Sequence, residues 1–212
     1  MNIPTDQISP QERCILHAAL RAISPLTDAD LDALPASRRH VLGRGDVLLR
    51  AGDHAQSSAF VISGGLREFY VLPDGTERTK SFNFPGGLAG SLSDLISGKA
   101  SRVWVVAEVP SVLVSTPWPA YQRLVESVPA WGRFARQIAE QLYMTKVQRE
   151  YELLALDAAE RYRSAVAQWP MLEAIFSQRD IASYIGVTPV HLSRLRAAAA
   201  PASPETQNPL PR

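Results

Sequence analysis

The sequence predicts an α+β fold, in which a jelly-roll-type β-roll is followed by a long helix and a C-terminal helix-turn-helix. Short β-rich runs separated by turn signals fill residues 40–115. No proline and only one glycine interrupt residues 130–156. Residues 177–199 contain two helix caps with a glycine between them. We therefore divide the chain into a β-roll with N-terminal helices (1–129), the long helix (130–156), a helix-turn-helix domain (157–200) and a tail (201–212).

The composition is that of a globular protein, with 212 residues, 46% of them hydrophobic, and a net charge of +1. This length allows one large or two small domains. No apolar run approaches the roughly 18 residues that cross a bilayer, and the start of the chain lacks the pattern of a secretory signal. We therefore expect a cytoplasmic protein that does not bind membranes. Cys14, the only cysteine, excludes an internal disulfide, and we expect it to be a small buried residue.

Two helices should precede the β-rich region. Ser9 and Glu12 have the spacing of a capping box, and Pro10 occupies the first helical position, which predicts a helix that ends at about Ile23. Residues 27–30 carry a second helix start, so a shorter helix should follow there.

The β-rich region contains several short runs bounded by turn residues. The predicted strands are Val47–Leu49, Ala59–Ile62, Leu66–Leu72, Thr76–Phe84, Arg102–Ala107 and Val112–Ser115. The turn signals are Gly45-Asp46, Gly52-Asp53, Gly64-Gly65 and Pro73-Asp74-Gly75. Strands of this length and spacing are typical of a jelly roll or a related barrel. The strands on either side of Pro73-Asp74-Gly75 should form a hairpin.

The long helix carries an apolar stripe at mostly three- and four-residue steps. Its members are Trp131, Phe134, Ala135, Ile138, Leu142, Val147, Tyr151 and Leu154. The pattern fits two interpretations equally: a helix packed on its own domain, or a seam between two copies of the chain. A further helix should occupy residues 157–169 and end before Pro170, and the proline-rich tail 201–212 should be disordered.

Residues 177–199 have the pattern of a helix-turn-helix. Ser177 can cap a helix over residues 178–184, Gly186 suits a tight turn, and Thr188-Pro189 can begin a second helix. The small core would consist of Ile181, Ala182, Ile185, Val187, Leu192 and Leu195. An ordinary αα-hairpin shares the glycine and the apolar pattern, but the coincidence of spacing, two caps and a polar face favours the DNA-binding motif.

The second helix of this motif should enter the major groove of DNA. The residues that we expect to contact DNA are Thr188, Pro189, Val190, His191, Ser193 and Arg194. The guanidinium of Arg194 can bond O6 and N7 of guanine together. Ser193 and His191 can reach a base edge or a phosphate, while Thr188 and the free N–H groups at the helix start suit a phosphate oxygen.

The order of β-roll, long helix and helix-turn-helix resembles the Crp–Fnr superfamily of bacterial transcription regulators, whose β-roll is a cyclic-nucleotide-binding-like sensor domain. The resemblance covers nearly the whole chain and is carried by GDVLLRAGD (45–53), FVISGGLREFYVLPDG (60–75), FPGGLAGSLSDL (84–95) and IASYIGVTPVHLSRLR (181–196). It implies a homodimer joined along the 130–156 helix, double-stranded DNA with an inverted-repeat operator, and RNA polymerase as a partner. Replacing Ile138 and Leu142 by Glu should then give monomers.

Two departures from the family pattern concern DNA binding. The Ser193-Arg194 pair matches positions that contact DNA in the family, but Val190 stands where Fnr-like members often carry Glu. The operator therefore need not match theirs. Most members have a β-hairpin wing before the motif, whereas here only Met171–Phe176 is available, so the wing must be very short or lost.

The effector loop departs from the pattern of cyclic-nucleotide binders, in which Gly-Glu-Leu reads the ribose and a later Arg-Ser or Arg-Thr pair neutralises the phosphate. The matching residues form our candidate effector site: Gly87, Gly90, Ser91, Leu92, Ser101 and Arg102. Ser91 and Ser101 replace the two charged residues, and Arg102 comes one residue late, which on a strand turns it to the other face. A cyclic nucleotide is therefore disfavoured, although a local bulge would restore Arg102. We predict no cofactor, and the loop fits either an anion or no ligand.

Other functions lack the residue clusters that they need. A metal-dependent cupin enzyme would need His-x-His with a nearby Glu, whereas His40 and His54 are isolated. Haem could use His17, His40 or His54, and the lone Cys14 disfavours an iron–sulfur cluster. We therefore predict a non-enzyme. The alternative is a ligand-binding adaptor with the same β-roll that contacts proteins rather than DNA.

Overall fold

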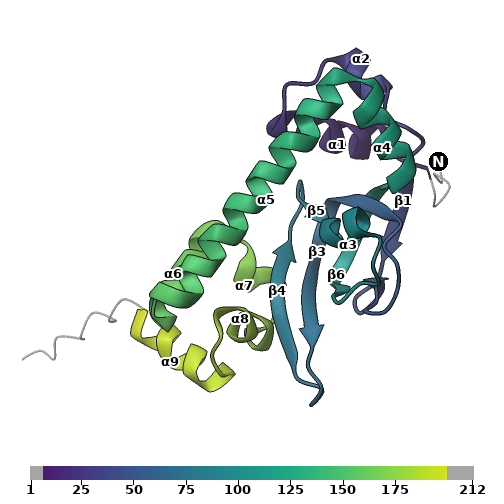
Figure 1. The fold of residues 1–212 in the computed structure, drawn as a ribbon. Coiled ribbons are helices and arrows are strands. Elements are labelled where there is room, and N and C mark those ends of the chain that lie inside the picture. Colours follow the sequence, from purple (N-terminus) through teal and green to yellow (C-terminus); the bar gives the residue numbers. More distant parts are fainter. Residues whose placement is uncertain (1–6, 200–212) are drawn as a thin grey trace, which may run out of the picture.

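The computed structural model describes residues 7–199. The helices are α1 (Pro10–Ile23), α2 (Asp28–Asp32), α3 (Leu92–Ser97), α4 (Trp118–Ser127), α5 (Pro129–Ala155), α6 (Ala158–Gln168), α7 (Leu172–Ile175), α8 (Gln178–Ile185) and α9 (Pro189–Ala199). The strands are β1 (Arg38–Leu42), β2 (Val47–Leu49), β3 (Ser57–Val71), β4 (Glu77–Asn83), β5 (Leu88–Ala89) and β6 (Trp104–Pro117). In Figure 1, α5 runs from the end that holds α1, α2 and α4 to the end that holds α6 and α9. No helix in this range is long and apolar enough to span a membrane.

The strands form an antiparallel sheet in the order β1-β6-β3-β4, with β2 also paired to β6 and β5 to β3. The long strands β3 and β6 pair along most of their length and form the centre of the roll. Its interior is lined by small and branched apolar side chains: Ala59, Val61, Leu66, Ala89, Val103, Val105, Ala107 and Leu113. The predicted α+β fold with an N-terminal β-roll is confirmed.

Strands β3 and β6 correct the strand prediction, which divided each of them into two. Gly64-Gly65 does not end β3, because the strand continues through it with register shifts against β6. Gly64 has φ +92°, and a Cβ there would lie 2.2 Å from Oγ of Ser111 on β6. The close approach of the two strands, and not a chain reversal, therefore requires this glycine.

The N-terminal helices begin at the predicted caps. Oγ of Ser9 accepts a hydrogen bond from the N–H of Glu12 at 3.2 Å, and Oε2 of Glu12 accepts one from the N–H of Ser9 at 2.8 Å. The prediction for Cys14 is wrong, since this residue is exposed. The reason is helical geometry: α1 turns Leu16 and Leu20 toward the core, and Cys14 lies on a different side of the helix.

The long helix α5 has one buried half and one exposed half. Trp131, Phe134 and Ile138 lie in a core shared with α1, α2 and α4, and Leu142 packs against that core. Ile138 therefore belongs to the core of its own domain, and the half-buried Leu142 packs at the edge of that core. Glu at both positions would disrupt the domain itself, so this substitution does not test a seam between two copies. Beyond Leu142 the large apolar residues of the helix are exposed.

The C-terminal part of the described chain is entirely helical. Helix α6 lies within the predicted 157–169 helix, and Asp157 caps it with a capping box. Residues 171–176 contain the short helix α7, so this segment holds no hairpin wing. The core of this part includes Leu172, Phe176 and the helix-turn-helix residues, and Phe82 of β4 joins it from the roll. The tail 201–212, which we expect to be disordered, lies outside the described residues.

Candidate nucleic-acid interface

Helix α8 and the turn after it have the local geometry that the sequence predicts. Oγ of Ser177 accepts a hydrogen bond from the N–H of Asp180 at 3.2 Å. Gly186 closes the helix in the left-handed conformation, with φ 79°. One face of α8 is buried, through Ile181, Ala182 and Ile185. The first helix of the motif is thereby held from both ends and along its apolar side.

Helix α9 begins at the predicted Thr188-Pro189 pair. Oγ1 of Thr188 accepts a hydrogen bond from the N–H of His191 at 3.2 Å, and Pro189 is the first residue of the helix. Nε2 of Gln178 on α8 donates to the carbonyl of Pro189 at 2.9 Å, which links the starts of the two helices. Leu192 is fully buried between them. This contact fixes which side of α9 faces outward.

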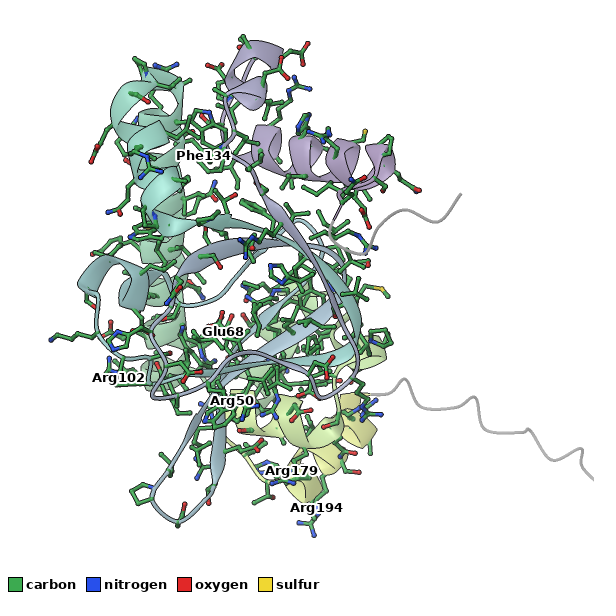
Figure 2. The ribbon with its side chains drawn as sticks, turned by 90° about the vertical axis from the view of Figure 1, so that its right-hand side faces the viewer. Arg50, Glu68, Arg102, Phe134, Arg179 and Arg194 are labelled. Carbon is green, nitrogen blue, oxygen red and sulfur yellow. The ribbon has the colours of Figure 1, made fainter. Side chains whose placement is uncertain are left out.

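The outward side of α9 carries the residues that we expect to contact DNA. Val190 is 63% exposed, and His191, Ser193 and Arg194 are also exposed. In Figure 2, Arg194 extends from the end of the molecule, and within the described chain its guanidinium has no hydrogen-bond or ion-pair partner. By contrast, Nε of Arg196 lies 3.0 Å from the carboxylate of Glu173. Arg194 is therefore the free cation of this face.

A further candidate, Arg179, is absent from the sequence prediction. It lies at the second position of α8, is exposed, and is labelled beside Arg194 at the same end of the molecule in Figure 2. In a docked helix-turn-helix the first helix crosses the phosphate backbone, so a cation at its start suits a phosphate. Its position two residues after the Ser177 cap is the sequence signal that could have identified it.

The candidate effector loop leaves β4 and leads into α3. The N–H of Gly86 donates to the carbonyl of Val61 at 2.8 Å, and the N–H of Val61 donates to the carbonyl of Gly87 at 3.0 Å, which holds the loop against β3. Gly87, Gly90 and Leu92 are half-buried. Ser91 is buried, and its Oγ lies 3.2 Å from Oγ of Ser93. The described loop thus places neutral side chains where the sequence predicted the effector site.

Ser101 and Arg102 point to opposite sides, as the one-residue shift predicts. Ser101 is buried, and its Oγ both accepts from the N–H of Val103 at 3.1 Å and donates to the carbonyl of Val103 at 3.2 Å. Arg102 is exposed, and Figure 2 shows it at the edge of the roll. Both residues precede β6, whose pairing begins at Trp104, so the strand predicted to begin at Arg102 begins two residues later.

The inner face of β3 and β4 carries a polar group that the sequence analysis missed. The carboxylate of Glu68 accepts from Nζ of Lys80 at 2.7 Å and from Nδ2 of Asn83 at 3.3 Å. Burial acts to lower the pKa of Lys80, but the charges of Glu68 and of Asp94 on α3 outweigh it and raise the pKa. Leu66 lies in the roll interior, and side chains two positions apart on a strand face the same side. This spacing is the sequence signal that could have placed Glu68 inside the roll.

The histidines do not form a metal centre. Nε2 of His40 lies 2.7 Å from Oγ of Ser115, and Nδ1 of His54 lies 3.1 Å from the carbonyl oxygen of Gly98. His17 borders a surface groove of about 410 Å³ between α1 and the chain after α2. Within residues 7–199, no three His, Cys, Asp or Glu residues are grouped so that they could hold a metal ion.

Comparison with known proteins agrees with this architecture. Residues 39–128, from β1 to the residue after α4, match the family model of the cyclic nucleotide-binding domain. The fumarate and nitrate reduction regulatory protein of Vibrio cholerae is 24% identical over 205 residues, covering 86% of this chain and 80% of that protein. The anaerobic regulatory protein of Haemophilus influenzae is 23% identical over 201 residues, and this alignment covers 86% of this chain and 77% of that protein. Over most of its length the chain is thus similar to regulators of the Crp–Fnr superfamily.

Solved structures of Crp–Fnr proteins share the fold. FixK2 from Bradyrhizobium japonicum superposes with a TM-score of 0.67 at 18% identity, covering 77% of this chain and 84% of FixK2. The catabolite activator protein of Thermus thermophilus has a TM-score of 0.53 at 26% identity and covers 85% of both chains. The family model ends before α5, so the helix-turn-helix of this chain is assigned by its own geometry.

Proposed function

We propose that this protein is a homodimeric, sequence-specific DNA-binding transcription regulator of the Crp–Fnr type whose β-roll responds to an effector. The observation that carries the proposal is the outward face of α9. Thr188 caps the helix, Leu192 packs it against α8, and Arg194 is left exposed without a partner in the described chain. A free guanidinium one turn into such a helix can bond O6 and N7 of guanine. The proposal includes a cytoplasmic location, because a regulator of this kind must reach the bacterial chromosome. It also includes RNA polymerase as a partner at promoters.

The exposed half of α5 supports the proposal of a dimer. Met144, Val147, Tyr151 and Leu154 follow one another at steps of three, four and three residues, which is the a/d spacing of a coiled coil. All four are exposed in the single chain, between 41% and 81%. An apolar seam of this kind fits a second copy of the same helix, because a two-fold axis brings the same residues together. The two recognition helices would then read half-sites about 34 Å apart.

Selection of duplexes from a random DNA pool, followed by mobility shift, tests DNA recognition. We expect an inverted repeat with a guanine in each arm, and we expect Arg194→Ala to weaken binding to it about ten- to a hundredfold. Binding to a scrambled duplex should fall much less. Arg123→Ala, which removes an exposed arginine from α4, is the matched control for net charge. A wild-type protein that shifts no duplex would favour the adaptor function, and equal losses on both duplexes would move base recognition to His191 or Ser193.

We further propose that cyclic AMP is not the effector. The two positions that would meet ribose and phosphate carry Ser91 and Ser101, both neutral and buried, and Arg102 points outward. The carboxylates of Glu68 and Asp94 are buried close to Lys80 on the inner side of the roll, where they disfavour an anion. Titration calorimetry with cyclic AMP should therefore show no micromolar binding, and such binding would contradict this proposal.

A further inference from the structure

Strands β3 and β4 face two parts of the molecule at once. Their inner residues Glu68 and Lys80 bond to each other inside the roll. Their outer residues Arg67 and Thr79 contact α8 of the helix-turn-helix. Because side chains alternate along a strand, each inner residue is the direct chain neighbour of an outer one. The effector side and the DNA-binding side are thus separated by a single strand backbone.

The first outer contact joins α8 to the edge of the sheet. Oγ of Ser183 accepts from the N–H of Thr79 at 2.9 Å and donates to the carbonyl of Glu77 at 3.1 Å. Strand β4 is the last in the sheet order, so these backbone groups have no neighbouring strand in the described chain. The hydroxyl of Ser183 thus supplies the hydrogen bonds that a neighbouring strand would otherwise make with these two groups.

The second outer contact is a buried ion-pair cluster around Arg67, whose side chain is 8% exposed. Its Nε lies 3.2 Å from Oδ1 of Asp180 on α8 and 2.7 Å from Oε1 of Glu108, and its Nη2 lies 2.8 Å from Oε2 of Glu77. Burial acts to lower the pKa of Arg67, but the bonds to Glu108 and Glu77 and the charge of Asp180 together raise it. Removing one partner would leave buried charge behind, so the cluster holds the two domains in a defined geometry.

The third outer contact is aromatic and uses the segment that replaces the wing. The ring of Phe82 lies 4.3 Å from that of Phe176 and 5.4 Å from that of Tyr184, measured between centroids. A Cβ on Gly65 of β3 would lie 2.6 Å from Cγ2 of Ile175, so only glycine allows α7 to approach the sheet so closely. The region where most family members carry a wing is therefore used here to dock the DNA-binding domain on the roll.

Residues on the inner face of β3 and β4 also contact the effector loop. Nδ2 of Asn83 donates both to Glu68, at 3.3 Å, and to the carbonyl of Leu88 in the loop, at 2.6 Å. Asp94 of α3 is buried and interacts electrostatically with Lys80. A displacement of the loop or of α3 therefore acts on β3 and β4 directly.

We propose that β3 and β4 couple the effector loop to the helix-turn-helix within one chain, without passing through α5 or a partner subunit. A shift of Glu68 or Lys80 moves the adjoining Arg67 and Thr79, and with them the anchors of α8 at Asp180 and Ser183. This regulatory role rests on the proposed function, but the mechanical link does not. Coupling between two sites is reciprocal, so releasing α8 must also loosen the loop.

Hydrogen exchange on the full chain tests the link through the mild variant Ser183→Ala. Besides the expected local change at Thr79, we expect amides in α3 whose bonds lie wholly within the loop region, such as Leu95 to Ser91 and Gly98 to Asp94, to exchange about two- to fivefold faster. Ser127→Ala on α4, whose hydroxyl bonds only within its own helix, is the matched control. Unchanged exchange in α3 after α8 is released would overturn the proposal.

The reverse experiment uses Lys80→Gln, with Lys99→Gln on the exposed loop after α3 as its control. Amides of residues 181–185 should exchange faster in Lys80→Gln, and the same change should have no further effect there in a Ser183→Ala background. An equal effect in both backgrounds would mean that the signal bypasses β4. If the wild type binds no DNA but shows this exchange pattern, the proposed function is contradicted and the coupling is not. If it binds DNA but lacks the pattern, the coupling is contradicted and the proposed function is not.

Discussion

The two halves of α5 carry similar apolar residues but do different things. In the first half Trp131 and Phe134 are at most 1% exposed, and Nε1 of Trp131 donates to the carbonyl of Asp30 at 2.9 Å. In the second half Tyr143 is 65% and Leu154 81% exposed. The difference arises because α1, α2 and α4 cover only the first half. An apolar stripe therefore indicates that a helix is covered, but it does not say by what.

The largest effect should come from truncating the covered half. Phe134→Ala should lower the free energy of unfolding by about 3–5 kcal/mol, because the cavity lies among neighbours that cannot collapse fully. Leu154→Ala, on the uncovered half, should change it by no more than about 0.5 kcal/mol in the dilute single chain. Urea denaturation followed by circular dichroism measures both. Equal losses would mean that the two halves are covered to the same extent.

The next effect concerns association. Val147→Glu combined with Leu154→Glu should raise the dissociation constant of the dimer at least about a hundredfold, since charges would meet across an apolar seam. The fold should persist, because both positions are exposed in the single chain. Light scattering over a concentration series gives the result. A control with Gln11→Glu and Gln122→Glu adds the same charge at exposed sites elsewhere, and a charged seam that still dimerises like this control would place the interface on another surface.

A smaller effect is expected where the second half of α5 touches its own chain. The guanidinium of Arg149 donates to the carbonyl of Tyr184, lies 3.8 Å from the centroid of its ring, and pairs with Glu152 at 3.2 Å. Arg149→Met should destabilise the protein by about 1–3 kcal/mol, because it removes these contacts and leaves Glu152 buried without its cation. Differential scanning calorimetry would detect this as a lower Tm. An unchanged Tm would show that α5 and α8 are held together by other contacts.

The smallest effect belongs to the outer face of the first half. Nη1 of Arg136 lies 2.8 Å from Oε1 of Glu140 one turn later, with side chains 65% and 57% exposed. Exposed pairs at this spacing contribute about 0.3–0.5 kcal/mol, so Arg136→Met should cost no more than this and should lose even that in high salt. Urea denaturation at two salt concentrations measures the difference. If Arg136→Met lowers the free energy of unfolding as much as Arg149→Met does, the difference in exposure between the two arginines does not determine their contributions to stability.

The helix-turn-helix was predictable from the sequence because its signals are local. Ser177 and Thr188 bond to residues three positions away, and Gly186 has the positive φ that its residue type favours. The opposite exposure of Ser101 and Arg102 agrees with the predicted alternation, although both residues precede β6, which begins at Trp104. Within Gly64-Gly65 the same logic failed, because Gly64 serves the approach of a strand more than 40 residues away, around Ser111.

The sequence by itself determined where helices begin, where the recognition helix lies and which of its residues face outward. It also determined that the effector loop carries no charged side chain at the positions of Ser91 and Ser101. These features depend on contacts within about one helical turn or on strand alternation. Only the tertiary structure decided which half of α5 is covered and that α7 and α8 dock on β3 and β4. Those outcomes depend on pairs such as Phe82 with Phe176 and Thr79 with Ser183, about 100 residues apart in the chain, and no local pattern records which distant surface will cover an apolar or polar side chain.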